Sequence, residues 1–522
     1  MKFVINKDDA RVTRLALYTF LGLAFLYRLY YAGSINLVPD EAYYWTWSRN
    51  LSLGYYDSGA ILAWVIRFFT DFMGNSELGV RMASIIFFIS TNILLYFLSS
   101  KFVKPIFALL SIVILNLTPG GVLLGILMMH DSLMAFFWVL TILSLYKAIL
   151  ENKKGFWYLA GIAAGFGLWS KDTMVLVIPA TFLFLVFSKE YRFWLKRKEP
   201  YFCVILMFLV FSPIIYWNSV HDWVTYRHIF ALGSRPEGMD KFKRMGDFVG
   251  SQLGLISPFI WLGILFAWIN IFILWIKDRG SKKAFLLSYS AFIFLFFLWL
   301  SSRSKVEGNW SGFAYYVGII CYFYVFQYFW EKKRKKGFVL YTKFAVIFSG
   351  ILVCLVLYPK LLYKLVYAIP YSSEKIIEGV RDNRTNDAHG WTQFGKEIRN
   401  FKNKFFGDQD VFIFGVRYQV SSQIAFYYPN IRTYCLPISR RMNQYDIWGG
   451  LEELKGKDGI FILDKWSDPS APEKLKKYFD SVIWMRDFTV YRNDMPTEDI
   501  RNYSIYVCRD FQGMKKDGFE KF

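Results

Sequence analysis

Long apolar runs separated by short polar loops fill the first two thirds of this chain. Runs long enough to cross a hydrocarbon core of roughly 30 Å recur, near residues 15–31, 80–100, 105–118, 124–146, 156–170, 174–188, 201–217, 250–276, 284–301, 310–330 and 338–358. The pattern therefore predicts about eleven transmembrane helices. Met1–Tyr31 is expected to be the first anchor, because its apolar part is long and lacks a small-residue cleavage site.

Two other segments follow different patterns. Ile61–Gly74 mixes apolar residues with Arg67 and Asp71 and is too short to cross, so we expect an amphipathic helix in the outer interface. After about residue 360 the apolar runs shorten, with strands expected at 411–414, 459–463 and 481–484 and a helix at 417–427. We predict a polytopic α-helical membrane domain over residues 1–359 and a soluble α/β domain over 360–522.

Composition and charge agree with this division. The chain is 55% hydrophobic with a mean hydropathy of +0.28, too apolar for one soluble core. Its net charge of +21 does not indicate a nucleic-acid partner, because the basic residues gather in alternate loops, at the N-terminus and near residues 101–104, 147–154, 189–198, 277–283 and 332–336. The positive-inside rule makes those loops cytoplasmic. With an odd number of crossings, the N-terminus is cytoplasmic and the C-terminal domain is periplasmic.

The first outer loop, Leu37–Ala60, holds the candidate chemistry. It contains an acidic pair, Asp40 and Glu41, and a third carboxylate, Asp57, among many aromatic residues. Carboxylates at a membrane boundary need water, a metal or a polar cavity, so a functional role is the default hypothesis. The alternative is a solvated loop whose tyrosines and tryptophans form an interfacial belt.

Later loops on the same face contribute further candidates. Asp131 is a second acidic position, and Lys171 is a cation available to a phosphate. His221 is a metal-ligand type, followed by Arg227. Each also has a structural alternative: Asp131 as a helix cap, Lys171 and Arg227 as interface anchors, and His221 as a hydrogen-bonded structural histidine.

No nucleotide-phosphate loop, dinucleotide fingerprint or zinc spacing occurs in the sequence. We therefore expect no nucleotide cofactor, and a donor delivered within the bilayer would serve an enzyme on the outer face. Of the five cysteines, Cys203, Cys321 and Cys354 fall in predicted spans, which leaves Cys435 and Cys508 as a candidate disulfide pair.

The assembled motifs resemble a known family. VPDEAYYWTWSRNLSLGYYD, HDSLMAFFW, WSKDT, WNSVHDW, GNW and RRMNQYDIW together are similar to the bacterial GT-C glycosyltransferases of the dolichyl-phosphate-mannose mannosyltransferase-like superfamily. Within it the chain resembles the lipid A aminoarabinose and galacturonic acid transferases. The resemblance covers most of the chain, and the acidic motif of the first loop is its most specific part.

The resemblance implies a transferase of the bacterial inner membrane that passes a sugar from undecaprenyl phosphate to a periplasmic acceptor, either a lipid such as lipid A or a protein. Membrane lipids would surround it. By motif position Asp40 would be the main catalytic carboxylate, with Glu41 beside it and Asp131 as the second-loop acid. The donor-phosphate residues would be Lys171 and Arg227.

The same match adds Tyr55 and Tyr56 to the donor side and makes Asp57 with His221 the candidates for a divalent-metal site. One departure is visible: the family's usual basic residue and Pro-Pro pair after the Tyr-Tyr-Asp-like segment are replaced by residues 58–60, which begin with Ser58. A positive charge expected near phosphate is thus missing at Ser58.

The predicted chemistry is a single displacement that inverts the anomeric carbon, with Asp40 as base and cations on the departing phosphate. A transporter or flippase for a lipid-linked glycan is the alternative from another class, although neither inverted repeats nor midplane polar groups are evident. A non-catalytic scaffold that binds glycan or a partner is a third option.

Overall fold

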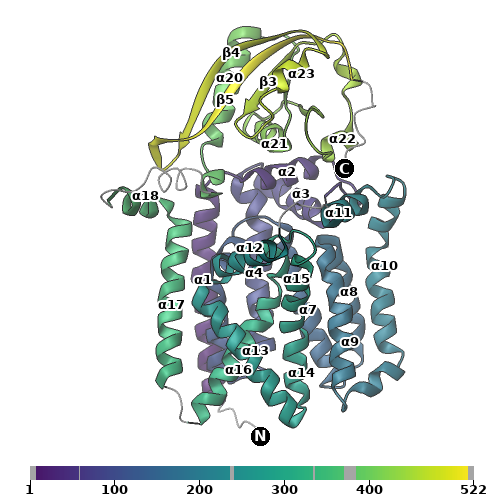
Figure 1. Ribbon diagram of the computed structural model, residues 1–522, viewed down its shortest axis with the longest axis vertical. Coiled ribbons are helices and arrows are strands. Elements are labelled where there is room, and N and C mark those ends of the chain that lie inside the picture. The colour runs from purple at the N-terminus through teal and green to yellow at the C-terminus, as the bar shows by residue number, and fades with distance from the viewer. Residues whose placement is uncertain (1–6, 58, 235–239, 333–335, 369–383, 515–522) are drawn as a thin grey trace.

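The computed structural model describes residues 7–57, 59–234, 240–332, 336–368 and 384–514. A bundle of roughly parallel helices forms the lower body, and a sheet domain sits at one end of it (Figure 1). The principal bundle helices are α1 (Lys7–Ser34), α4 (Glu77–Ser99), α5 (Pro105–Asn116), α7 (His130–Ile149), α8 (Gly155–Ser170), α9 (Val177–Phe187), α10 (Glu199–Ser219), α13 (Pro258–Asp278), α14 (Ser281–Ser288), α15 (Ala291–Ser301), α16 (Ala314–Glu331) and α17 (Lys336–Leu357).

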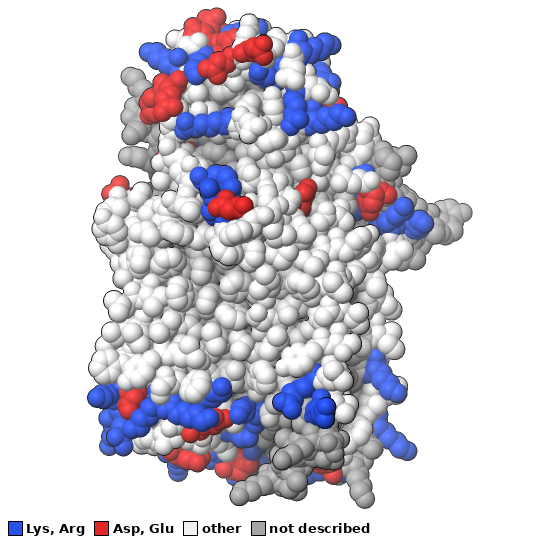
Figure 2. Space-filling model, turned by 180° about the vertical axis from the view of Figure 1, so that it is seen from behind, with Lys and Arg blue, Asp and Glu red and all other residues white. Residues whose placement is uncertain are grey.

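Within the described ranges, seven helical segments are long and apolar enough to span a membrane, and two shorter apolar helices accompany them. The multi-pass helical fold is therefore confirmed, while the number eleven stays a prediction. Figure 2 shows the same division on the surface: a broad uncharged belt lies between a lower band rich in Lys and Arg and an upper domain of mixed charge. The basic band is what the positive-inside rule anticipates at one membrane face.

One predicted span begins in the wrong place. Residues 250–276 do not form one helix, because α12 (Lys241–Ile256) ends before α13 starts and lies across the bundle in Figure 1. Ser257 between them has a φ of 78°, and Pro258 is the first residue of α13. Proline lacks an N–H and disfavours helical backbone in the residue before it, so the chain turns here.

Short helices occupy the boundary between the bundle and the sheet domain. They include α2 (Pro39–Arg49), α3 (Ile61–Met73), α6 (Pro119–Leu124), α11 (Val224–Ser234) and the 3₁₀ turns η1 (Asp172–Leu176) and η3 (Gly308–Ser311). The amphipathic helix predicted after the acidic loop is confirmed as α3. Leu62 and Ile66 on one side of it are buried, while Trp64, Phe68 and Phe72 are exposed.

The sheet domain confirms the predicted α/β class. Its described strands are β1 (Phe412–Gly415), β2 (Thr433–Cys435), β3 (Gly459–Asp464), β4 (Phe479–Arg492) and β5 (Met495–Phe511), in the order β2-β1-β3-β5-β4. The first three are parallel and the rest antiparallel, with Ile413 opposite Ile460 and Ile460 opposite Val507. The described helices are α18 (Pro359–Ala368), α20 (Trp391–Phe406), α21 (Tyr418–Tyr427), α22 (Gln444–Trp448) and α23 (Ala471–Leu475).

The candidate cysteine pair, Cys435 and Cys508, does not form a disulfide. Cys435 lies on β2 and Cys508 on β5, and both thiols are free and buried. Strands β1 and β3 stand between them, so three strand spacings of about 4.8 Å separate the two cysteines. That separation exceeds the roughly 7 Å between Cα atoms that a disulfide tolerates.

Helix α21 joins the sheet domain to the membrane domain by lying on α2. Gln423 donates to the Leu37 carbonyl at 2.8 Å, and the Leu37 N–H donates to the Tyr427 hydroxyl at 2.8 Å. Phe426 packs edge-on against Trp45 with ring centroids 5.1 Å apart. The sheet domain therefore covers the acidic loop.

Candidate active site beneath the outer domain

Asp40 lies in the first turn of α2, directly under the sheet domain. The helix begins there because Val38 is extended and Pro39 supplies the fixed φ of a first helical residue. Acidic side chains in a first turn also interact favourably with the positive end of the helix dipole. The Tyr418 hydroxyl of α21 donates to Asp40 Oδ1 at 3.0 Å, so the outer domain contributes directly to this carboxylate's surroundings.

Glu41 faces the opposite way and forms a buried ion pair. Neither its side chain nor that of Arg81 on α4 is exposed, and the Arg81 Nε and Nη2 atoms reach its two oxygens at 2.8 and 2.5 Å. The Val38 and Met128 N–H groups donate to the same carboxylate. With its acceptor positions engaged and no access to a substrate, Glu41 positions α2, which corrects the prediction of a catalytic role.

Asp57 sits at the tip of a tight loop closed by a bridge between Gly54 and Gly59. The Tyr43 hydroxyl donates to Asp57 Oδ2 at 3.1 Å, and His228 Nε2 lies 3.6 Å from Oδ1. Burial raises the pKa of this carboxyl to about 6, although Tyr43 and the charge of Arg441 oppose the shift. The Asp57 side chain is thus partly buried, with 26% of its surface exposed.

The second acidic position lies across the site in a compact polar group. Lys171 Nζ at the end of α8 is 2.7 Å from Asp131 Oδ1 in the first turn of α7. Asn309 of η3 donates to the other oxygen, Oδ2, at 2.9 Å. Lys171 and Asp131 are 16% and 15% exposed, so this pair reaches a solvent-accessible space from a largely buried position. The structure therefore brings together HDS, WSK and GNW, three motifs far apart in the sequence.

Tyr44 lies between the first outer loop and the polar group around Asp131. Its ring packs edge-on against His130, the neighbour of Asp131, with centroids 4.7 Å apart. Burial raises the pKa of Tyr44 well above its usual value, and the negative charges of Asp40 and Asp57 raise it further, as does that of Asp131. One tyrosine is thus within electrostatic reach of two carboxylates of the first outer loop and of Asp131 at the start of α7.

The two donor-side tyrosines lie inside the protein. Tyr55 is fully buried, stacks on Trp47 with centroids 4.4 Å apart and donates to the backbone carbonyls of Trp47 and Asn50. Tyr56 is also fully buried, and its hydroxyl pairs with His228 Nδ1 at 3.0 Å. Both therefore support the Asp57 loop from within, and neither presents a surface to a ligand. Ser58 lies outside the described residues.

His221 packs on the end of α10, and Arg227 lines a separate cleft. The His221 ring stacks on Trp217 at 4.1 Å, and its Nδ1 lies 2.8 Å from the Trp217 carbonyl oxygen, an arrangement typical of a structural histidine. Arg227 on α11 lines a separate cleft of about 620 Å³, which is otherwise mainly apolar and has Asp172 at its wall. Asp172 follows Lys171 directly, so this cleft adjoins the polar group around Asp131.

The predicted metal pair does not come together. His228, rather than His221, faces Asp57. Within the described residues no group of three or more His, Cys, Asp or Glu side chains could hold a metal ion. A carboxylate and one imidazole that already pairs with Tyr56 do not make a complete metal site, so no step of the chemistry below depends on a metal.

Several residues of the site were missed by the sequence interpretation. Arg81 has a detectable signal, because it is a charged residue within an apolar span and such residues require a partner. Asn309 lies in the GNW motif, but its contact with Asp131 could not be foreseen, and Tyr418 and His228 have no signal, since only the fold brings these residues to the acidic side chains.

The chain is similar in sequence to a known family and to a curated protein. The sequence model of the family described as dolichyl-phosphate-mannose-protein mannosyltransferase matches residues 57–217. The lipid A galacturonosyltransferase RgtD of Rhizobium johnstonii is 24% identical over 295 residues, which are 56% of this chain and 61% of that protein. This chain thus matches less than two thirds of that curated relative's length.

Two solved structures have the same fold. The apo structure of ArnT from Cupriavidus metallidurans superposes with a TM-score of 0.64 at 14% identity, covering 95% of this chain and 98% of that one. ArnT bound to undecaprenyl phosphate gives a TM-score of 0.61 at 14% identity over 94% and 97% of the two chains. The predicted resemblance to the GT-C glycosyltransferases is confirmed.

Proposed function

We propose that this chain, similar in motifs and fold to the GT-C glycosyltransferases, transfers a sugar from a polyprenyl phosphate such as undecaprenyl phosphate to an envelope acceptor. The acceptor would be lipid A, another glycolipid or a protein. Residues 1–359 would form the catalytic domain in the bacterial inner membrane, with the N-terminus cytoplasmic. Residues 360–522 would form the periplasmic domain that covers the site.

The convergence at Tyr44 supports this proposal best. The charges of Asp40, Asp57 and Asp131 all act on Tyr44 and raise its pKa, and Asp131 pairs with the Lys171 ammonium. Transfer from a lipid phosphate needs little more than a base for the acceptor and a cation for the departing phosphate, because phosphate is already a good leaving group. The site contains both.

In the proposed mechanism Asp40 removes the proton from the acceptor nucleophile as the nucleophile attacks the anomeric carbon. Tyr418 holds the Asp40 carboxylate in place through Oδ1, and Glu41 with Arg81 fixes the helix that carries it. The bond from the anomeric carbon to the phosphate oxygen breaks in the same step. One displacement inverts that carbon.

Lys171 would stabilise the phosphate that leaves. In the resting protein its ammonium is held by Asp131, whose other oxygen is fixed by Asn309. A donor phosphate would compete for the ammonium and strengthen its charge-assisted hydrogen bonds as negative charge accumulates. Asp131 and Asn309 therefore act as positioning residues for Lys171.

The test uses purified full-length protein with a synthetic polyprenyl-phosphate sugar of defined anomeric configuration and a lipid A acceptor. We expect product of inverted configuration by NMR, and no turnover by the Asp40→Asn variant. Retained configuration or a trapped glycosyl-enzyme would refute the single displacement. Transport of the lipid donor across proteoliposomes without sugar transfer would refute the enzyme assignment itself.

A further inference from the structure

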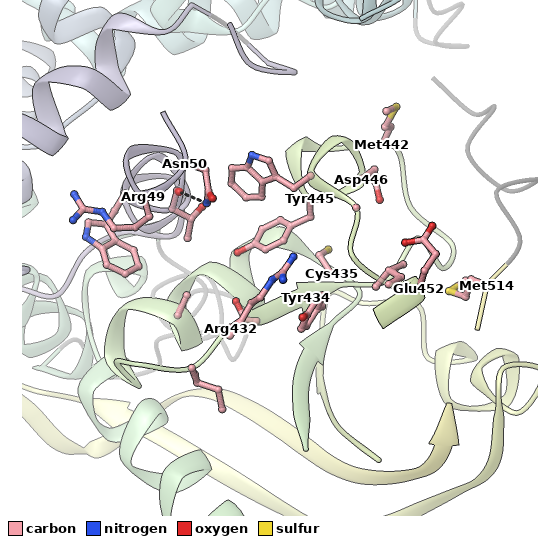
Figure 3. Close-up of a pocket in the computed structure, with 18 of the residues that line it drawn as sticks. Arg49, Asn50, Arg432, Tyr434, Cys435, Met442, Tyr445, Asp446, Glu452 and Met514 are labelled. Carbon is pink, nitrogen blue, oxygen red and sulfur yellow. Dashed lines mark hydrogen bonds between the residues drawn. The ribbon is translucent and has the colours of Figure 1, made fainter. Parts of the chain in front are cut away.

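A second cavity of about 660 Å³ opens between the C-terminal half of α2 and the sheet domain (Figure 3). Its lining includes Trp45 and Arg49 of α2, Arg432 and Tyr434 at β2, and Tyr445 and Trp448 of α22. The Tyr445 ring also lies parallel to Tyr43, the partner of Asp57, with centroids 6.3 Å apart. Through this contact the cavity adjoins the candidate active site.

The surroundings of the Arg432 guanidinium suit the binding of an anionic group. Gly450 has a φ of +84°, and a Cβ on it would lie 2.5 Å from the Arg432 Nη2 atom, so the glycine backbone lies close against the guanidinium. The Tyr434 ring lies 5.1 Å from the guanidinium carbon. The partner carboxylate of Glu453 is 3.4 Å away, and both side chains are more than half exposed. Such a pair is weak in water, which leaves most of the guanidinium donors for a ligand.

The remaining lining suits a sugar ring. Trp45, Tyr434, Tyr445 and Trp448 offer aromatic faces on which the apolar face of a pyranose can stack. The side chains of Asn50 and Glu452 add polar groups that can bind hydroxyls. Figure 3 shows Arg432 and Tyr445 extending toward the middle of the cavity from different elements.

The position of α3 indicates that the occupant is a lipid. Arg49 at the cavity wall donates to Thr70 of α3 at 2.5 Å, so the cavity adjoins this amphipathic helix. The exposed stripe of Trp64, Phe68 and Phe72 on α3 suits acyl chains at the membrane surface. A glycolipid could therefore place its sugar headgroup in the cavity and its acyl chains along α3.

We propose that this cavity is the acceptor subsite and that Arg432 binds a phosphate or carboxylate on the acceptor's sugar headgroup. The acceptor role rests on the proposed function, whereas binding itself does not. The inference selects an anionic glycolipid over a protein as the acceptor. Arg432 acts here as a specificity-determining residue and takes no part in the chemical step.

Binding is measured directly, without turnover, by titrating the full-length protein in nanodiscs with bisphosphorylated lipid A and with fully dephosphorylated lipid A. For the wild type we expect the dephosphorylated lipid to bind about tenfold or more weakly, as loss of a charge-assisted contact predicts. Arg432→Ala should weaken binding of the phosphorylated lipid by the same factor and leave the dephosphorylated lipid unaffected. Arg432→Lys should recover part of the affinity.

The matched control is Arg486→Ala in the same domain. Arg486 also pairs with a glutamate, Glu397 at 2.9 Å, and lies near aromatic rings, but it does not line the cavity. Equal affinities for the two lipids, or equal losses in the Arg432 and Arg486 variants, would overturn the subsite. Preferred binding of an acceptor protein that survives Arg432→Ala would overturn the choice of lipid.

The proposed function is tested separately by following donor consumption with lipid A present, because the single displacement requires the acceptor as its nucleophile. If the wild type binds phosphorylated lipid A through Arg432 but never consumes the donor, the transferase assignment fails and the binding site stands. If the donor is consumed but lipid A binds independently of Arg432, the subsite fails alone.

Discussion

Replacing Glu41 with glutamine tests whether the acidic pair is divided between chemistry and structure. The substitution keeps the size of the side chain but removes its charge, so the Arg81 guanidinium is left in a fully buried site without a counter-ion. In either orientation the amide NH₂ group would also face two donors that now bond a carboxylate oxygen: Arg81 Nη2 and the Val38 N–H at Oε2, or Arg81 Nε and the Met128 N–H at Oε1. Breaking one side of a buried ion pair typically costs about 3–5 kcal/mol.

At roughly 2–4 °C per kcal/mol this cost corresponds to a fall of the order of 10 °C in the unfolding temperature of the solubilised protein. Thermal unfolding followed by tryptophan fluorescence measures it. The matched control is Asp40→Asn, which keeps an oxygen for the Tyr418 hydroxyl and should leave the unfolding temperature within about 2 °C while abolishing transfer. A Glu41→Gln protein with wild-type stability and no activity would refute this division of roles.

Three further outcomes follow from the site. Lys171→Ala should raise the KM for the donor about tenfold or more, with little change in the KM for the acceptor, because a charged contact to the phosphate is lost. An unchanged KM for the donor would mean that Lys171 is only the ion-pair partner of Asp131. Burial raises the pKa of Asp57 from 3.8 to about 6, so between these pH values the folded chain retains a proton that the unfolded chain releases. The contribution of Asp57 to the free energy of unfolding therefore falls as the pH rises from about 4 to 6, by at most about 3 kcal/mol. Asp57→Asn should flatten the unfolding temperature over that range, and an unaltered pH profile would contradict the raised pKa. Reducing agent should leave the unfolding temperature unchanged, since Cys435 and Cys508 are free thiols; a fall of several degrees would indicate a disulfide.

The linear pattern of this chain was sufficient for much of the fold. Length and apolarity predict the bundle helices, because a segment of about 20 apolar residues has few stable places other than a membrane. Alternation and turn residues likewise predicted β1, β3 and α21, which are confirmed. The amphipathic α3 was readable because its apolar positions recur with the helical period.

The pattern was insufficient wherever a role depends on a partner from another segment. Asp40 and Glu41 are identical in kind and adjacent in sequence, but successive helix positions point about 100° apart, so one faces Tyr418 and the other Arg81. Packing also decides which histidine faces Asp57: the sequence interpretation had selected His221, but His228 is the one that lies beside it. It also explains the free cysteines, because strand order rather than spacing separates Cys435 from Cys508.

The sequence by itself thus determined the membrane class, the sheet domain and the loops that contain charged chemistry, since these follow from the solvent preference of local runs. Only the tertiary structure decided which partners these carboxylates meet, Lys171 for Asp131 and Tyr418 for Asp40, because that depends on helix rotation and on the docking of α21 over α2. It alone also revealed the cavity around Arg432, whose walls come from α2, β2 and α22. The local sequence determines whether a segment forms a membrane helix, a strand or a loop, whereas packing determines which side chains of other segments it contacts.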